Sequence, residues 1–127
     1  MDKDEKARYS ILIMEDEPIL GKVCRRILEA EGYKIIIAGD GIDAKEKLEK
    51  NKFDFCLSDI KTPLMNGMEL FAFLQVKYPA LASHTVFMTG DFMNKNIQDF
   101  LKKTDVPCLF KPFTDQTLVE TVEKYLK

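Results

Sequence analysis

The chain has 127 residues, of which 46% are hydrophobic and 31% charged, and its formal net charge is -2. This balance excludes a disordered chain and predicts a single domain with one hydrophobic core. The basic residues are scattered, so we expect no direct contact with nucleic acid. We place the core at about residues 9–127 and treat residues 1–8 as a polar N-terminal lead.

The chain also lacks sequence signals for a membrane or a secretory route. No apolar run approaches the roughly 20 residues that cross a bilayer, and the opening "MDKDEKARYS" has no apolar signal-peptide core. Cys24, Cys56 and Cys108 are widely separated and have no metal-binding spacing. We therefore expect free thiols and a cytoplasmic protein without membrane contact.

Apolar runs and helical periodicities alternate along the chain. In order they predict a strand at 9–14, a helix at 18–31, a strand at 33–38, a helix at 42–50, a strand at 53–58, a helix at 67–78, a strand at 85–89, a helix at 94–103, a strand at 107–110 and a helix at 114–127. Pro18 suits the first turn of a helix, Gly32 a helix end, and Thr114 an N-cap. Pro107 indicates an edge position for the last strand.

Five strands alternating with five helices predict an α/β fold. The expected arrangement is a doubly wound five-stranded parallel sheet with right-handed crossovers. The strands are apolar almost throughout, which is typical of a sheet that is covered on both faces. Ligands of such folds bind beyond the carboxyl ends of the strands.

Polar side chains follow four of the five predicted strands. They are Glu15, Asp16 and Glu17 after the first, Asp59 after the third, Thr89 and Asp91 after the fourth, and Lys111 after the fifth. Because parallel strands end at one edge of the sheet, we expect these side chains to converge. Clustered carboxylates favour a cation, and oxygen ligands without His or Cys suit Mg²⁺.

This set of groups has what phosphoryl transfer needs. A carboxylate at a strand end, here Asp59, can act as a nucleophile and form an aspartyl phosphate. The metal ion and the ammonium of Lys111 would offset charge on the phosphoryl oxygens, and the Thr89 hydroxyl would donate a hydrogen bond to one of them. Asp59 is therefore the expected reactive residue.

The motifs "ILIMEDEP", "SDIKTPLMNG", "VFMTG" and "LFKPF" stand in this order between residues 10 and 126. As a set they resemble the receiver domain of two-component response regulators. The resemblance implies a flavodoxin-like (βα)5 fold with strand order 2-1-3-4-5. It also implies that a sensor histidine kinase or a histidine phosphotransfer protein is the partner. Such a domain is not an enzyme in the usual sense, because it catalyses only its own phosphorylation and dephosphorylation.

The resemblance further implies a role for each matching residue. Asp59 is the phospho-acceptor, Thr89 the switch hydroxyl and Lys111 the phosphoryl-binding lysine. A cis peptide bond is implied between Lys111 and Pro112. The implied ligands of Mg²⁺, or of Mn²⁺, are Glu15, Asp16, Asp59 and the backbone carbonyl of Lys61. A weak homodimer through the fourth predicted helix, the fifth strand and the fifth helix is a further expectation.

Three positions near the site are expected to modulate it. Cys108 stands where many receiver domains carry Tyr or Phe, so it lacks the ring that moves in those members. Lys61 and Asp91 each stand two residues beyond a site residue and carry opposite charges. They are expected either to pair across the mouth of the site or to leave Lys61 free to reach a phosphoryl oxygen.

Other interpretations of the sequence stay open. A degenerate receiver would only bind partners. A haloacid-dehalogenase-type phosphatase uses D-x-D-x-T, but Lys61 stands in "DIKT" where its second aspartate belongs. A flavodoxin-type FMN module needs a phosphate loop after the first strand, where "EDEP" would repel a phosphate.

Overall fold

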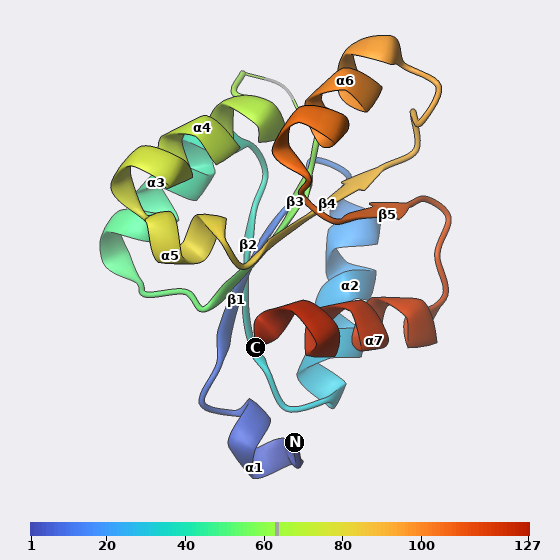
Figure 1. The fold of residues 1–127 in the computed structure, drawn as a ribbon. Coiled ribbons are helices and arrows are strands. Elements are labelled where there is room, and N and C mark those ends of the chain that lie inside the picture. The colour runs from blue at the N-terminus through green and yellow to red at the C-terminus, as the bar shows by residue number, and fades with distance from the viewer. Residues whose placement is uncertain (63) are drawn as a thin grey trace.

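The computed structural model describes residues 1–62 and 64–127. Within these ranges five parallel strands form one sheet in the order β2-β1-β3-β4-β5 (Figure 1). The strands are β1 (Ser10–Met14), β2 (Lys34–Ala38), β3 (Phe55–Asp59), β4 (Thr85–Thr89) and β5 (Cys108–Phe110). The predicted strand order is confirmed, and β5 is an edge strand, as Pro107 indicated.

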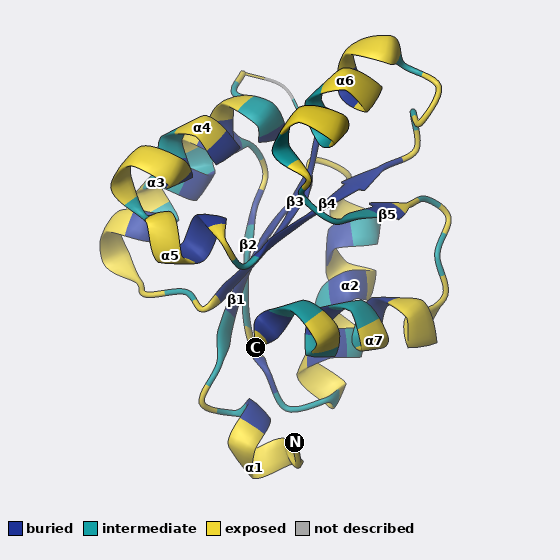
Figure 2. Ribbon diagram, viewed as in Figure 1, coloured by how far each residue is buried: buried dark blue, intermediate teal, exposed yellow. Residues whose placement is uncertain are grey.

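Helices cover both faces of the sheet, so the doubly wound prediction is also confirmed. One face packs against α2 (Pro18–Ala30) and α7 (Asp115–Leu126), and the other against α3 (Gly41–Lys50), α4 (Gly67–Lys77) and α6 (Lys95–Thr104) (Figure 1). The central strands and the inner sides of the helices are buried, as the dark blue ribbon in Figure 2 shows. No helix in the described ranges has the length and apolar composition that crossing a bilayer requires.

The polar lead differs from the prediction, because part of it is a folded element. Lys3–Lys6 form the short helix α1, which the side chain of Asp2 caps. The Nζ atom of Lys6 lies 2.7 Å from Glu31 Oε1 and 2.9 Å from Glu123 Oε1, and Lys6 is only 6% exposed. A four-residue helix is too short to show a hydrophobic period, which is why sequence patterning missed it.

A second short helix, α5 (Pro79–Ala82), was also not predicted. The preceding helix α4 ends at Lys77, as expected from a proline two residues later. Pro79 then starts a new turn, because proline lacks only an N–H that the first turn leaves unpaired anyway. The proline therefore both ends one helix and begins another.

The strand register brings the carboxyl ends of the strands to one edge of the sheet. Met14 pairs with Ser58, Asp59 with Met88, and Thr89 with Phe110. Asp59 is thus the last residue of β3, one position further into the strand than the sequence pattern predicted. This edge is the upper side of the molecule in Figure 1.

The three cysteines are free thiols, as predicted. Cys24 and Cys56 are buried, and Cys108 in β5 is half-buried, beside Phe87 in the sheet register. Burial raises the pKa of Cys56 to about 12 and the pKa values of Cys24 and Cys108 to about 11. At neutral pH all three are therefore protonated and weakly nucleophilic.

Candidate functional site

Asp59 is fixed at the end of β3 by hydrogen bonds to its side chain and its backbone. Its Oδ2 atom accepts a bond of 2.7 Å from Lys111 Nζ, and its Oδ1 atom accepts one of 3.0 Å from the backbone N–H of Lys61. The hydroxyl of Ser58 donates to the Asp59 carbonyl oxygen at 3.0 Å. Asp59 is 6% exposed. The carboxylate is therefore held in one orientation and still borders solvent.

Two acids from the loop after β1 lie beside Asp59. Carboxylate oxygens of Glu15, Asp16 and Asp59 all lie within 4.8 Å of one another. Glu15 is buried, with Oε1 bound to Lys111 Nζ at 2.7 Å, whereas Asp16 is exposed. Burial, reinforced by the neighbouring Asp59 carboxylate, raises the pKa of Glu15 to about 8, although Lys111 acts in the opposite direction.

These three carboxylates fit a hard divalent cation. The Lys111 ammonium alone does not balance their charge. The Oε2 atom of Glu15 is buried without a hydrogen-bond partner among the described residues. An unpartnered buried carboxylate oxygen is costly unless a cation or a proton satisfies it. An all-oxygen donor set of this kind suits Mg²⁺.

Lys111 follows β5 and reaches back across the edge of the sheet to Asp59 and Glu15. Its backbone N–H donates to the Thr89 carbonyl at 2.8 Å, and its peptide bond with Pro112 is cis. Burial would lower the pKa of Lys111, but its bonds with Asp59 and Glu15 outweigh burial and raise it. The lysine therefore carries a positive charge at neutral pH.

The loop after β4 brings Thr89 and Asp91 to the same edge. Thr89 is 1% exposed, and its Oγ1 atom accepts a hydrogen bond of 3.0 Å from the backbone N–H of Asp91. The side chain of Asp91 forms an ion pair with Lys61, which belongs to the loop after β3. The hydrogen bond from Lys61 lowers the pKa of Asp91. Of the two alternatives that the sequence left open for Lys61, the structure shows pairing with Asp91.

Asn66 and Gly67 were not predicted as site residues, but they position the loop that leaves Asp59. The Asn66 side chain accepts a hydrogen bond of 2.9 Å from the backbone N–H of Glu69, and the Glu69 side chain accepts one of 3.3 Å from the backbone N–H of Asn66, which forms a capping box. A Cβ atom on Gly67 would lie 2.4 Å from the Asp59 carbonyl oxygen. The signal was present in the sequence, because Asn followed three residues later by Glu is typical of a helix start.

An acidic carboxyl edge on a doubly wound sheet, with a lysine held against an aspartate, is the arrangement of a phospho-acceptor signalling module. A family model described as response regulator receiver domain matches residues 11–123. The chain therefore belongs to the response regulator receiver domain family. This membership sets aside the phosphatase and FMN-module interpretations.

Individual similar proteins support this family assignment. The transcriptional regulatory protein RprY of Bacteroides fragilis is 30% identical over 127 residues, which cover 100% of this chain and 52% of that protein. The chain thus spans about half the length of this curated relative. A CheY-like receiver domain protein from Methanospirillum hungatei has a TM-score of 0.83 and 28% identity, with 93% of each chain covered.

A further solved structure shows the same fold. The receiver domain of sensor histidine kinase PA1611 from Pseudomonas aeruginosa has a TM-score of 0.81 and 22% identity, covering 93% of this chain and 97% of that one. That structure is described with a magnesium ion coordinated in its active-site cleft. At this identity the likeness shows the fold alone.

Proposed function

We propose that Asp59 receives a phosphoryl group from the phosphohistidine of a sensor histidine kinase or of a histidine phosphotransfer protein, in a reaction that needs Mg²⁺ or Mn²⁺. The observation that supports this most directly is the contact of 2.7 Å between Asp59 Oδ2 and Lys111 Nζ. It places an ammonium beside a strand-end carboxylate that is fixed in orientation and borders solvent. Residues 1–127 act as one receiver domain in this proposal.

The transfer is an in-line displacement at phosphorus. A carboxylate oxygen of Asp59 forms a bond to phosphorus while the bond from phosphorus to the donor imidazole nitrogen breaks, and the imidazole keeps that electron pair. Lys111 then binds a phosphoryl oxygen in place of the Asp59 oxygen. Thr89 exchanges its contact with the Asp91 N–H for a hydrogen bond that its hydroxyl donates to the phosphoryl group.

The residues proposed to bind the metal lie close enough together to share one ion. Glu15, Asp16, Asp59 and the backbone carbonyl of Lys61 would hold the ion, and Glu15 would use its unpartnered Oε2 atom. When bound, the ion offsets negative charge on the phosphoryl oxygens during transfer. The three free thiols agree with a reducing compartment, so we place the domain in the cytoplasm.

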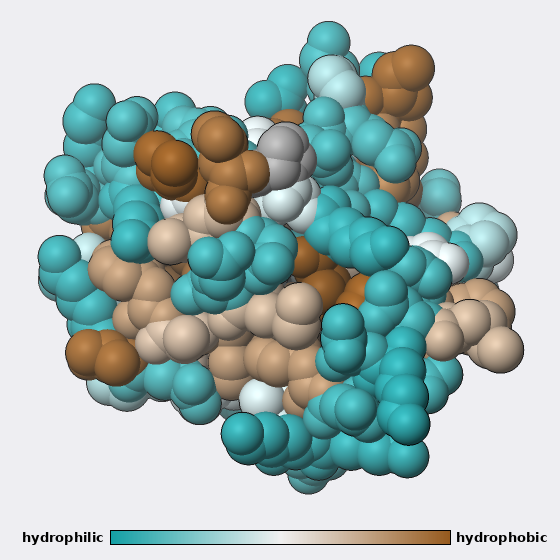
Figure 3. Space-filling view, turned by 90° about the horizontal axis from the view of Figure 1, so that it is seen from above, coloured by the Kyte–Doolittle hydropathy of each residue, from teal (hydrophilic) through white to brown (hydrophobic). Residues whose placement is uncertain are grey.

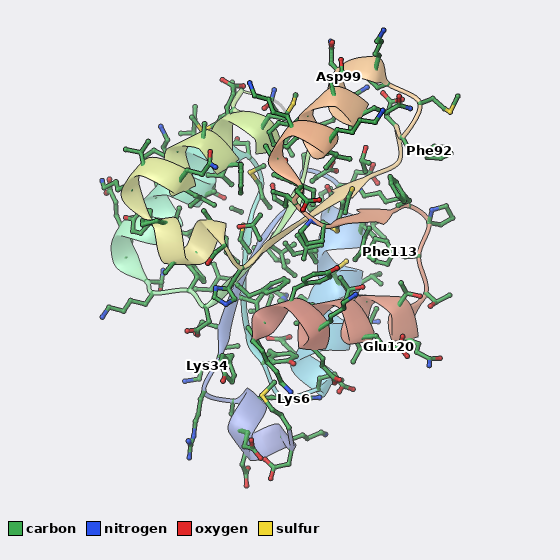
Figure 4. All side chains as sticks on the ribbon, viewed as in Figure 1. Lys6, Lys34, Phe92, Asp99, Phe113 and Glu120 are labelled. Carbon is green, nitrogen blue, oxygen red and sulfur yellow. The ribbon has the colours of Figure 1, made fainter. Side chains whose placement is uncertain are left out.

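The test is labelling by a small phosphodonor such as phosphoramidate in the presence of Mg²⁺. Asp59→Asn should abolish the label and keep the fold, because the two side chains are nearly isosteric. The label on the parent protein should be lost in alkali and in hydroxylamine, as expected of an acyl phosphate. Asp99→Asn is the matched control, because Asp99 projects outward from α6 (Figure 4).

Three other labelling results would contradict the proposal or show that the variant has lost its fold. A label that survives Asp59→Asn and resists alkali would contradict the proposal and indicate Ser or Thr. A parent protein that takes no label from any donor, with Mg²⁺ present, would favour the degenerate receiver that only binds partners. If Asp99→Asn loses the label as completely as Asp59→Asn, the loss would reflect damage to the fold and not removal of the phospho-acceptor.

A weak homodimer through α6, β5 and α7 is a second proposal. Phe92 and Phe110 are about half exposed, Met93 is 76% exposed, and the two rings meet edge to face with centroids 5.8 Å apart. Figure 4 shows Phe92 projecting from the loop before α6, and Figure 3 shows hydrophobic areas among hydrophilic ones on the upper face. Basic residues of α6 could face acidic residues of α7 across a two-fold axis: Lys95, Lys102 and Lys103 against Asp115 and Glu120.

Sedimentation velocity tests the dimer. The parent protein should sediment faster as its concentration rises into the range of hundreds of micromolar, and Phe110→Ser should remain a monomer. Val76→Ser is the matched control, because Val76 is 87% exposed on α4, outside the proposed interface. Equal behaviour of the parent and Phe110→Ser would rule out this interface.

A further inference from the structure

Leu64, in the loop between β3 and α4, has a backbone conformation that is unusual for its residue type. Its φ angle is 65°, in the left-handed region where a side chain crowds the backbone. Glycine, asparagine and aspartate occupy this region at the least cost, and the other described non-glycine residue with a positive φ, Asp105 at 55°, is of this kind. The local backbone therefore disfavours a leucine at position 64.

Hydrogen bonds on both sides of Leu64 impose this conformation. The hydroxyl of Thr62 donates to the Met65 carbonyl oxygen at 2.9 Å, and the backbone N–H of Gly41 donates to the same oxygen at 3.0 Å. The next residue along the chain, Asn66, is the N-cap of α4. A disfavoured backbone conformation persists only where its surroundings fix it in this way.

Packing inside the domain does not account for the leucine either. The side chain of Leu64 is 76% exposed, so it gains little from burial. Ile42, at the start of α3, is 49% exposed. The bond from Gly41 to Met65 places Ile42 and Leu64 one residue to either side of a single contact. Two exposed apolar residues are thus brought together at the carboxyl edge of the sheet, and neither is explained by the fold.

The position of Leu64 indicates what covers it. The Ile60 carbonyl accepts a bond of 2.9 Å from the Gly67 N–H, so the loop closes on itself, and Gly67 lies against Asp59. Leu64 is three residues from Gly67, and three extended residues span at most about 11 Å. A standard protein interface covers about 800 Å² on each partner, which is a disc with a radius of roughly 16 Å. A protein that brings a phosphohistidine to Asp59 therefore also covers Leu64.

We propose that Leu64, together with Ile42, is an apolar anchor for the protein that donates the phosphoryl group to Asp59. The donor that fits this anchor presents an apolar side chain beside its phosphohistidine, because an exposed leucine is stabilised by losing contact with water. Leu64 is a specificity residue in this scheme: it contacts the donor protein and does not touch the reacting atoms. The proposal rests on Asp59 being the phospho-acceptor.

The experiment compares a protein donor with a small donor. The protein donor is the histidine kinase or phosphotransfer protein that labels the parent fastest in a profile of the source organism's full set, and the small donor is phosphoramidate. Leu64→Ala should slow transfer from the protein donor about tenfold, as expected when an anchor side chain is truncated, and Ile42→Ala should slow it less. Leu64→Met keeps an apolar side chain of similar size and should stay within about twofold of the parent.

Labelling by phosphoramidate should be the same in all these variants, because so small a donor cannot contact position 64 while it reacts at Asp59. Val76→Ala is the matched control for both donors. Val76 is 87% exposed in the last turn of α4, away from the carboxyl edge, and its truncation should change neither rate.

A second readout separates an anchor from a structural residue. Leu64→Asn removes the apolar side chain and relieves the backbone, because asparagine tolerates the left-handed region. Its urea midpoint should rise above that of the parent, while its transfer from the protein donor falls as far as in Leu64→Ala. A residue that only supports the fold would lose stability and transfer together.

Four results would overturn the proposal. They are equal transfer from the protein donor in the parent and Leu64→Ala, an equal loss of phosphoramidate labelling in Leu64→Ala, a urea midpoint of Leu64→Asn at or below that of the parent, and a parent that no protein donor labels. Failure of the proposed function is recognised separately, because phosphoramidate would then leave the parent unlabelled or would still label Asp59→Asn.

Discussion

At the scale of single residues, Gly67 shows how closely the chain packs behind Asp59. A Cβ atom at this position would lie 2.4 Å from the Asp59 carbonyl oxygen and 2.9 Å from the Ile60 Cα atom, and both neighbours are backbone. Gly67→Ala must therefore shift the loop, and we expect a loss of about 1–3 kcal/mol in the free energy of unfolding together with slower phosphorylation. Urea unfolding and the rate of labelling measure the two effects.

Gly39→Ala is the matched control for Gly67→Ala. A Cβ atom on Gly39 would meet nothing within 4 Å. The same substitution there should change the free energy of unfolding by less than about 0.5 kcal/mol and leave the labelling rate unchanged. Equal effects at the two glycines would show that the close approach to Asp59 is unimportant.

The half-buried thiol of Cys108 gives a second prediction at this scale. Burial raises its pKa to about 11, so its thiolate fraction at pH 8 is roughly a hundredfold below that of a free cysteine. Higher intrinsic nucleophilicity restores about tenfold of this. Iodoacetamide should therefore alkylate Cys108 at about a tenth of the rate for a free cysteine, measured by mass spectrometry of peptides. Unfolding in urea should remove the difference, and a fast native reaction would contradict the burial argument.

At the scale of elements, Lys6 attaches α1 to the rest of the domain. Its Nζ atom binds Glu31 at the end of α2 and Glu123 in α7, and it lies 5.6 Å from the ring centroid of Tyr33. Lys6→Met should therefore lower the free energy of unfolding by about 1–3 kcal/mol. Urea unfolding measures this loss. Lys3→Met is the control because Lys3 is exposed, and an equal loss in both variants would contradict the attachment.

The contribution of Lys6 also has a defined pH dependence. Burial alone would lower its pKa, but the bonds with Glu31 and Glu123 outweigh burial and raise it above the ordinary value of about 10.4. The folded state therefore holds this proton more tightly than the unfolded state. The stabilisation is complete below pH 10 and is lost as the pH rises through the raised pKa. The difference in stability between the parent and Lys6→Met should thus stay constant from pH 7 to 9.

At the scale of the whole molecule, the proposed metal site at the acidic edge predicts that Mg²⁺ stabilises the fold. A ligand that binds only the folded state adds about 1.4 kcal/mol for each tenfold increase above its dissociation constant. Raising Mg²⁺ should therefore raise the melting temperature, and EDTA should reverse the rise. Asp16→Asn should abolish it, and Asp99→Asn should keep it. A rise of the same size in Asp16→Asn would contradict the proposed ligand set.

The sequence by itself determined the order of elements, the doubly wound sheet and the convergence of Asp59, Glu15 and Lys111. These features follow from local periodicity and from the place of each residue at a strand end, because parallel strands share one carboxyl edge. The sequence patterns did not predict α1 or α5, because a helix of four residues is too short to show a hydrophobic period. They also left Asp59 one position outside β3, because strand ends depend on pairing with neighbouring strands.

Only the tertiary structure decided the contacts between distant segments. Lys6 and Glu123 are 117 positions apart, and no local pattern marks them as partners. Lys61 pairs with Asp91 and is not left free to reach a phosphoryl oxygen. This pairing depends on how closely the loops after β3 and β4 approach once the strands have paired. The need for glycine at position 67 depends on the path of α4 past the Asp59 carbonyl. Each of these is set by packing in three dimensions, where a displacement of an ångström changes which atoms meet.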